Sequence, residues 1–185
     1  AFNSDMGVLS TVYARPDGES RPAAAELDAT QLDQLTRYLS TLGVSARRDL
    51  ADPRARRGEQ LFAETGCTRC HTPRLKTGGF HPLAELRNQS IQPYTDLLLH
   101  DMGPGLADNL GEGSATGAEW RTAPLWSIGL TKGVSGGESY LHDGRARSLS
   151  EAILWHAGEG EASREAFRKL NQSNRNSLIT FLKSL

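Results

Sequence analysis

The 185-residue sequence has few cysteines, few aromatic rings and no long apolar run. Its two cysteines are too few for a zinc site built on cysteine, which needs about four ligands. No window approaches the roughly 18 consecutive apolar residues of a membrane-spanning helix, so no membrane span is expected. The 21 basic and 22 acidic side chains nearly cancel, which gives no reason to expect nucleic acid or an anionic membrane as a partner.

The scarcity of large side chains suggests a core completed by something other than protein. Aromatic residues make up 6% of the chain, and there are 19 glycines. A chain of this length forms one or two domains and can bury a sizeable core. Many loops and a modest side-chain core are therefore expected, and a buried porphyrin would fill the deficit.

The motif Cys67-Thr-Arg-Cys70-His71 predicts a covalently attached haem c. Two thiols three positions apart lie on one helical turn and match the separation of the two porphyrin vinyl groups. The imidazole of the next residue then points at the iron. Because thioether bonds hold the haem against dissociation, a periplasmic or otherwise extracytoplasmic location is expected.

Two other readings of the cysteine pair fit less well. A thioredoxin-type dithiol would follow a strand in a βαβ pattern, and no such pattern precedes Gly66. A disulfide between Cys67 and Cys70 would leave His71 unexplained. The segment from Gly58 to Phe62, followed by Gly66, instead reads as the first helix of a haem domain running into its attachment loop.

The helical signals predict a mostly α fold with a cytochrome c-like core. Pro53 marks a first helical turn, and Ser148 is an N-cap with Glu151 at the third position of a capping box. The stretch 72–147, rich in Gly, Pro, Asn and Asp, is interpreted as long loops around a cofactor, with short helices such as 94–100. The predicted helices are 26–42, 53–64, 149–156, 161–170 and 174–185, of which 53–64, 149–156 and 174–185 form the core.

An internal repeat suggests that a second haem domain precedes this one. Residues 31–42 align without gaps with residues 174–185, pairing Leu35 with Leu178, Tyr38 with Phe181, Leu39 with Leu182 and Leu42 with Leu185. Both segments resemble the closing helix of a cytochrome c domain, although two amphipathic helices can share such a pattern by chance. On this hypothesis, residues 1–50 are the tail, closing helix and linker of an upstream haem domain, and residues 51–185 are the haem domain.

The second axial ligand of the iron has several candidates. His156 closes an apolar helical face formed by Leu149, Ala152 and Ile153, where a polar imidazole needs a partner. Met102 lies in a loop of the kind that delivers methionine to haem, and it is the alternative ligand. The remaining candidates are weaker: His100 beside Asp101 as a ligand or a surface pair, His142 in a turn, and His81 facing solvent; Met6 falls in the upstream tail.

Four segments resemble the C-terminal half of a known bacterial family. They are Tyr94–Asp108, Trp120–Trp126, Tyr140–Arg147 and Leu149–His156, and the resemblance runs over the whole chain. The family is that of di-haem oxidoreductases described as putative peroxidases, also called thiol oxidoreductases. It implies an N-terminal half with a second haem, which carries the peroxidatic site where one exists.

A more distant resemblance, to di-haem cytochrome c peroxidases and their tryptophylquinone-maturing relatives, concerns the distal ligand. Counted from the turn at His142, the position of that ligand (methionine in the peroxidases, tyrosine in the maturing enzymes) matches His156. The departure to histidine puts the usual high-potential role in doubt, because methionine ligation raises the potential. Arg121 resembles a loop arginine near the haem propionates, and its other reading is a surface ion pair.

These observations predict electron transfer through one covalent haem c, ligated by His71 and His156, without a catalytic residue in this chain. Electrons would pass to the haem of an upstream domain of the same protein, and a small redox protein is a further partner. Two alternatives stay open. One is a stand-alone haem enzyme with an open iron site for peroxide or another small molecule, and the other is a mono-haem carrier with His/Met ligation through Met102.

Overall fold

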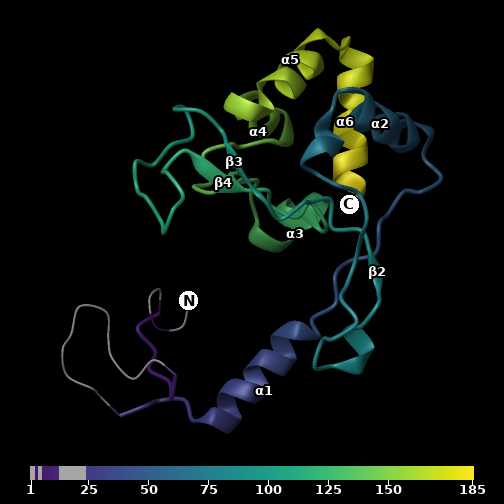
Figure 1. Ribbon diagram of the computed structural model, residues 1–185. Coiled ribbons are helices and arrows are strands. Elements are labelled where there is room, and N and C mark those ends of the chain that lie inside the picture. Colours follow the sequence, from purple (N-terminus) through teal and green to yellow (C-terminus); the bar gives the residue numbers. More distant parts are fainter. Residues whose placement is uncertain (1–2, 4–5, 13–23) are drawn as a thin grey trace. The chain divides into compact units, whose positions relative to one another are not determined.

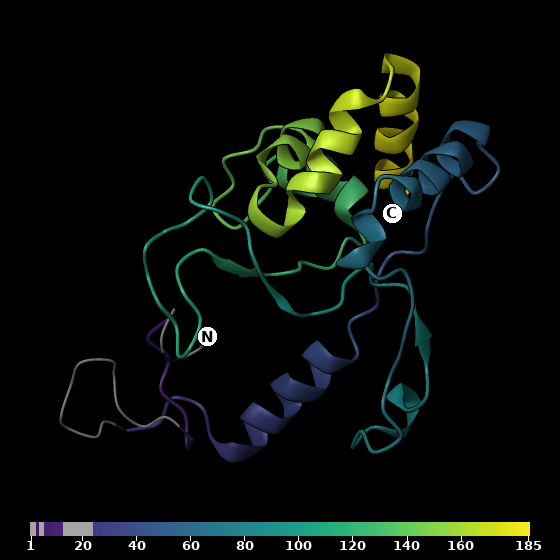
Figure 2. The ribbon, with the colours of Figure 1, turned by 45° about the horizontal axis from the view of Figure 1, so that its top comes forward.

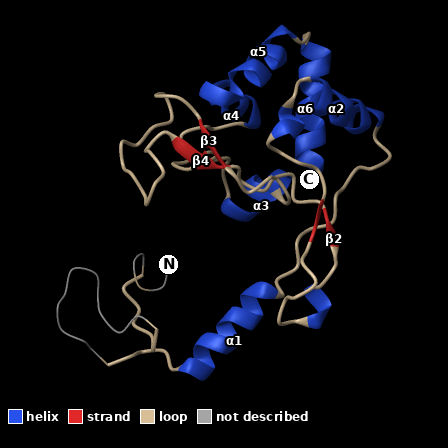
Figure 3. Ribbon diagram, in the orientation of Figure 1, coloured by secondary structure: helices blue, strands red, loops and turns tan. Residues whose placement is uncertain are grey.

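The computed structural model describes residues 3, 6–12 and 24–185, and its regular structure consists mainly of helices with little sheet (Figures 1 and 3). The chain divides into two compact units, Ala1–Gly43 and Val44–Leu185. Parts of the expected upstream tail, residues 1–2, 4–5 and 13–23, lie outside the described residues. No helix in the described part is long and apolar enough to cross a membrane. The α-helices are α1 (Ala29–Ser40), α2 (Pro53–Glu64), α3 (Thr131–Ser135), α4 (Leu149–Trp155), α5 (Glu161–Lys169) and α6 (Gln172–Ser184).

The first unit is built around α1. Asp28 caps this helix by accepting from the Gln31 amide at 2.8 Å, while the Gln31 side chain accepts from the Asp28 amide at 2.9 Å, which completes a capping box. A single parallel bridge joins Ser10 to Leu27. No residue of α1 is buried: Leu32 and Leu35 are half-buried, and Leu39 is exposed.

The second unit is centred on the packing of α2 against α6, which lie side by side in Figures 1 and 2. Asp52 caps α2 through the Arg54 amide at 2.7 Å, and Pro53 occupies the first turn. Gly58 faces α6 so closely that a Cβ there would overlap the backbone carbonyl of Ser177 and meet the Phe181 Cβ at 2.6 Å. The absence of a side chain at residue 58 is what lets the two helices approach.

The hydrophobic core surrounds this crossing. Phe181, Leu61 and Leu178 are the largest fully buried apolar side chains. Phe62 packs against Phe181 with ring centroids 5.3 Å apart and against the Tyr94 ring edge-on at 6.1 Å. The cluster consists of Leu61, Phe62, Tyr94, Tyr140, Ala146, Leu149, Phe167, Leu178, Phe181, Leu182 and Leu185.

Residues just before α2 tie the chain to the end of α6. The Arg48 amide donates to the Ser184 carbonyl at 2.7 Å, and its guanidinium donates to the Lys183 and Leu185 carbonyls. These carbonyls have no partner inside the helix, so a cationic donor at this end satisfies them. Arg47 lies over the Phe181 ring at 4.9 Å and pairs with Glu59 at 2.9 Å.

The long stretch between η1 (Cys67–Arg69) and α4 is mostly irregular, as expected. Its strands form two small antiparallel pairs, β1 (Leu75–Lys76) with β2 (Ser90–Ile91) and β3 (Leu99–Asp101) with β4 (Glu119–Arg121). In the second pair, His100 lies opposite Trp120. The remaining 3-10 turns are η2 (Ala84–Leu86), η3 (Ile128–Leu130) and η4 (Gly158–Gly160), and α3 follows η3.

The five long helices predicted from the sequence are confirmed within a few residues, but the prediction of a short helix at 94–100 is wrong. Tyr94 and Leu97 adopt left-handed φ angles of 53° and 61°, which interrupt a right-handed helix. The Thr95 amide donates instead to the Thr72 carbonyl at 3.1 Å, and its hydroxyl donates to the Thr122 carbonyl at 2.6 Å. Long-range contacts therefore override the local preference of this leucine-rich segment.

The α2–α6 crossing predicts that Gly58→Ala lowers the free energy of unfolding by at least about 2 kcal/mol, because the added methyl group overlaps backbone. Gly133→Ala in α3 is the control, since its Cβ would meet nothing within 4 Å. That change is expected to be neutral or stabilising by up to about 1 kcal/mol. Urea unfolding followed by circular dichroism measures both, and equal effects would contradict the prediction.

Candidate functional site

The Cys67–His71 motif begins immediately after α2. Gly66 adopts a left-handed φ of 84°, which turns the chain out of the helix into η1. The buried Thr65 hydroxyl donates to the Leu61 carbonyl at 2.7 Å and lies 3.4 Å from the Cys67 sulfur. The His71 amide then donates to the Cys67 carbonyl at 2.9 Å, so the whole motif forms one tight turn at the end of a buried helix.

Cys67 and Cys70 are not joined by a disulfide. Burial raises the pKa of Cys67, and burial together with the negative charges of Asp96 and Glu159 raises the pKa of Cys70. Redox-active dithiols depend on a thiol with a lowered pKa, because the thiolate is the nucleophile. The electrostatics of this turn are therefore unlike those of a thioredoxin-type site.

The His71 ring is oriented by the backbone of a distant loop. Its Nδ1 lies 2.9 Å from the Tyr94 carbonyl oxygen, and since a carbonyl only accepts, Nδ1 carries the proton. The Nε2 lone pair is then available to a metal. Burial lowers the pKa of His71 to about 4, so the ring is neutral near pH 7, the form in which an imidazole binds a metal.

His156 is oriented in the same way by its own helix. It is the C-cap of α4, a helix that begins at the Ser148 N-cap as predicted. Its amide donates to the Ile153 carbonyl at 3.2 Å, which leaves the Ala152 carbonyl to accept from the ring Nδ1 at 2.8 Å. Burial lowers the pKa of His156, and the second ring nitrogen is again free of a proton.

The two rings lie close together although they are far apart in the sequence. The centroids of His71 and His156 are 6.5 Å apart, with an angle of 50° between the planes. Two imidazoles that share one metal ion, with bonds of about 2 Å, hold their centroids roughly 6 Å apart. Two neutral imidazoles with proton-free Nε2 atoms at this spacing are a donor set that fits a haem iron.

Met102, the alternative ligand, lies beside His156. Its Cε and the Cβ of His156 both lie within 3.4 Å of the point where a Cβ would stand on Gly160. Its backbone amide donates to the Ala118 carbonyl at 2.9 Å, which anchors the loop. Met102 thus packs on the segment that carries His156.

The other histidines are engaged elsewhere. His100 contacts Asp96 through Nε2 and Glu159 through Nδ1, each at 2.9 Å, so both of its nitrogens are occupied. His142 is exposed and stacks on Trp120 with centroids 3.5 Å apart. His81 is half-buried and accepts from the Leu83 amide at 3.1 Å through Nδ1.

Comparison with known families gives one match. The family described as "Di-haem oxidoreductase, putative peroxidase" matches residues 6–185. The chain belongs to this family. Membership implies haem binding and places the chain among oxidoreductases. Searches of curated proteins and of solved structures returned no significant match.

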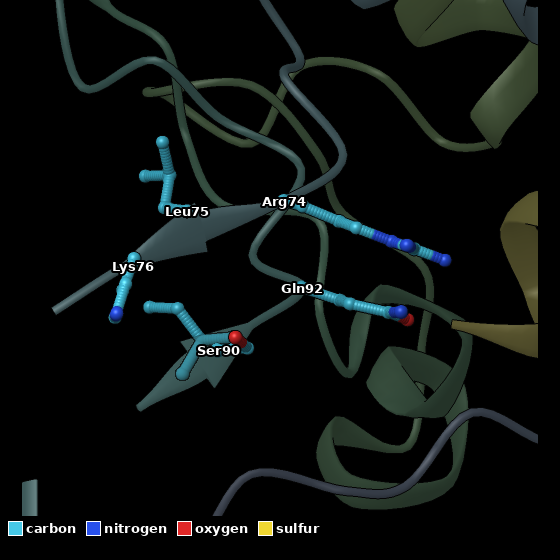
Figure 4. A pocket seen from close by; sticks show the side chains of 6 residues that line it. Arg74, Leu75, Lys76, Ser90 and Gln92 are labelled. Carbon is cyan, nitrogen blue, oxygen red and sulfur yellow. The ribbon is translucent and has the colours of Figure 1, made fainter. Parts of the chain in front are cut away.

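Arg121 and one surface pocket lie apart from the paired histidines. Arg121 is exposed on β4, opposite Leu99, and forms no ion pair within the described residues. A shallow pocket of about 540 Å³ lies on the β1–β2 hairpin (Figure 4). It contains none of the predicted haem ligands, and its lining consists of Arg74, Leu75, Lys76, Ser90, Ile91 and Gln92.

Two parts of the site were not predicted from the sequence. One is the Tyr94 carbonyl, which no side-chain pattern could reveal. The other is the pair of carboxylates on His100: the sequence suggested its neighbour Asp101, whereas Asp96 and Glu159 occupy that role. The four-residue spacing of Asp96 and His100 was the only local signal, and it is one that also occurs on ordinary helices.

Proposed function

We propose that this chain binds one haem c through Cys67 and Cys70, with His71 and His156 as the axial ligands, and that it transfers electrons. The observation that carries the proposal is the pair of neutral imidazoles with centroids 6.5 Å apart, each with Nδ1 donating to a backbone carbonyl. When bound, the haem supplies one-electron chemistry at its iron. The irregular stretch 72–147 would wrap it, with Arg121 near the propionates.

The protein groups around the two histidines would tune this site. A carbonyl that accepts from the Nδ1 proton fixes the ring orientation and makes the opposite nitrogen a stronger donor. The Tyr94 and Ala152 carbonyls act on the two rings alike. Two imidazole ligands leave the reduction potential lower than a histidine–methionine pair does, which suits exchange with a second haem outside the cytoplasm.

The upstream haem domain of the same protein is the proposed electron partner, with a small redox protein as a further one. The support comes from α1, which has the same pattern as α6 but a different environment. Tyr38, Leu39 and Leu42 are 62%, 53% and 53% exposed, whereas their counterparts Phe181, Leu182 and Leu185 are 0%, 4% and 4% exposed. An apolar face of this kind needs a helix equivalent to α2 to cover it.

The attachment proposal predicts that the haem of the holoprotein stays on the polypeptide during extraction with acidified acetone. Replacing both Cys67 and Cys70 by serine removes both thioether bonds, so the haem of that variant should be extracted. His142→Ala, which leaves the motif intact, serves as the control. Haem that leaves the unmodified protein freely would refute covalent attachment.

The ligation proposal predicts that His156→Ala converts a low-spin, six-coordinate iron to a high-spin or readily ligated one, because a strong-field nitrogen is lost. His142→Ala and Met102→Ala should leave the low-spin spectrum unchanged. Optical and electron paramagnetic resonance spectra of the ferric proteins distinguish the cases. A low-spin His156→Ala variant combined with an altered Met102→Ala variant would establish the carrier alternative, and a high-spin parent would establish the open-site enzyme.

The upstream-domain proposal predicts that Leu39→Glu lowers the free energy of unfolding of the natural gene product by at least about 2 kcal/mol. In residues 1–185 alone, the same change should cost less than about 0.5 kcal/mol, because Leu39 is exposed there. Gln34→Glu adds the same group elsewhere on α1 and is the control in both proteins. A natural product with a single haem, or one that is insensitive to Leu39→Glu, would contradict the proposal.

A further inference from the structure

Three side chains connect the segments that hold His71 and His156. The His100 ring lies between two carboxylates, with Nε2 2.9 Å from Asp96 Oδ2 and Nδ1 2.9 Å from Glu159 Oε2. Asp96 follows Tyr94, whose carbonyl orients His71, by two residues. Glu159 follows His156 by three residues, within η4. The set Asp96, His100 and Glu159 is called the His100 bridge below.

The His100 ring carries a positive charge when it donates to both carboxylates. A neutral imidazole donates from one nitrogen only, so donation to both carboxylates requires the protonated ring. Hydrogen bonding to Glu159 is the main cause that raises the pKa of His100, and Asp96 adds to it. The His100 and Asp96 side chains are only 16% and 14% exposed, which limits screening of their contact by solvent, whereas the Glu159 side chain is 56% exposed and its contact with His100 is screened more.

Both ends of the bridge are fixed further by backbone groups. Glu159 Oε1 accepts from the Asp101 amide at 3.0 Å, and Asp96 Oδ1 accepts from the Leu98 amide at 2.9 Å. Gly158, with a left-handed φ of 52°, lies so close to β3 that a Cβ would overlap the Asp101 carbonyl. The turn after His156 is therefore held against β3 by its main chain as well.

The attachment motif adjoins the same bridge. Ligand atoms of Cys70, Asp96 and His100 all lie within 4.8 Å of one another. His71 directly follows Cys70 in the chain. The bridge thus lies near Cys70, the neighbour of His71, and is joined through Glu159 to the segment that follows His156.

We propose that His100 is a positioning residue, which keeps the His156 segment at the correct separation from His71 by joining Asp96 to Glu159. The inference rests on the ligation proposed above and adds the group that holds the second ligand in place. Without the bridge, η4 and His156 move more freely. His156 then leaves the iron more often, and a competing small ligand gains access.

The test compares the ferrous holoprotein with His100→Ala, Glu159→Gln and the control His142→Ala. His142 is a suitable control because it forms no short bond to a carboxylate: its Nε2 lies 3.9 Å from Asp143 Oδ2. Loss of a group that hydrogen-bonds a metal ligand costs about 10-fold to 100-fold in metal affinity or activity, and His100 acts on His156 only through Glu159, so the lower end of this range is expected. We therefore expect carbon monoxide to bind His100→Ala at least about 10-fold faster than the parent. Glu159→Gln, which keeps an acceptor for the Asp101 amide, should be intermediate, and His142→Ala unchanged.

The outcomes separate the two proposals. A parent protein without a low-spin spectrum would refute the ligation proposal, on which the bridge rests. A low-spin parent whose His100→Ala and Glu159→Gln variants bind carbon monoxide at the rate of His142→Ala refutes the bridge, even if their unfolding free energies fall. If His100→Ala does not incorporate haem, the Glu159→Gln variant alone tests the bridge. Its ferric resonance spectrum and carbon monoxide rate must then both differ from those of the parent.

Discussion

The close crossing of α2 and α6 is the contact on which the second unit of this protein, Val44–Leu185, depends. The crossing needs a residue without a side chain, and Gly58 provides it against Ser177 and Phe181. Because α2 ends directly at the attachment motif, its position decides where Cys67 and His71 stand. This close packing thus lies in the helix that leads into the proposed cofactor site, where a small shift of the helix would be transmitted to His71.

A chain of aromatic contacts carries this constraint from the helices to His71, the proposed metal ligand. Phe181 contacts Phe62, and Phe62 contacts both the Tyr94 ring and the His71 ring, the latter at 6.1 Å. Tyr94 has a left-handed φ of 53°, which is uncommon for a bulky residue and costs free energy. Burial of its ring in the core offsets that cost, and in this conformation its carbonyl accepts from His71.

The parts of this architecture that follow from local rules could be predicted, and the parts that follow from distant contacts could not. Pro53, Ser148 and the leucine spacing of residues 174–185 specify helices through their own neighbours, so α2, α4 and α6 were expected nearly as they are. The segment 94–100 has a helical composition, but Thr95 is drawn to Thr72 and Thr122 instead. The cysteine motif was evident from its spacing, whereas the partner of His100 and the support of His71 come from elsewhere in the chain.

The two histidines differ in what holds them, and this difference explains why a bridge matters. The His71 ring donates a hydrogen bond to a carbonyl far away in the sequence, so the tertiary structure fixes its orientation. His156 is bonded to Ala152 of its own helix, and this bond fixes the ring relative to α4 without fixing α4 relative to His71. The second constraint must come from contacts beyond that helix. The segment just after His156 has such contacts, through Glu159 and the main chain of Gly158 against β3. A ligand oriented locally in this way depends on its neighbours for its distance from the other ligand.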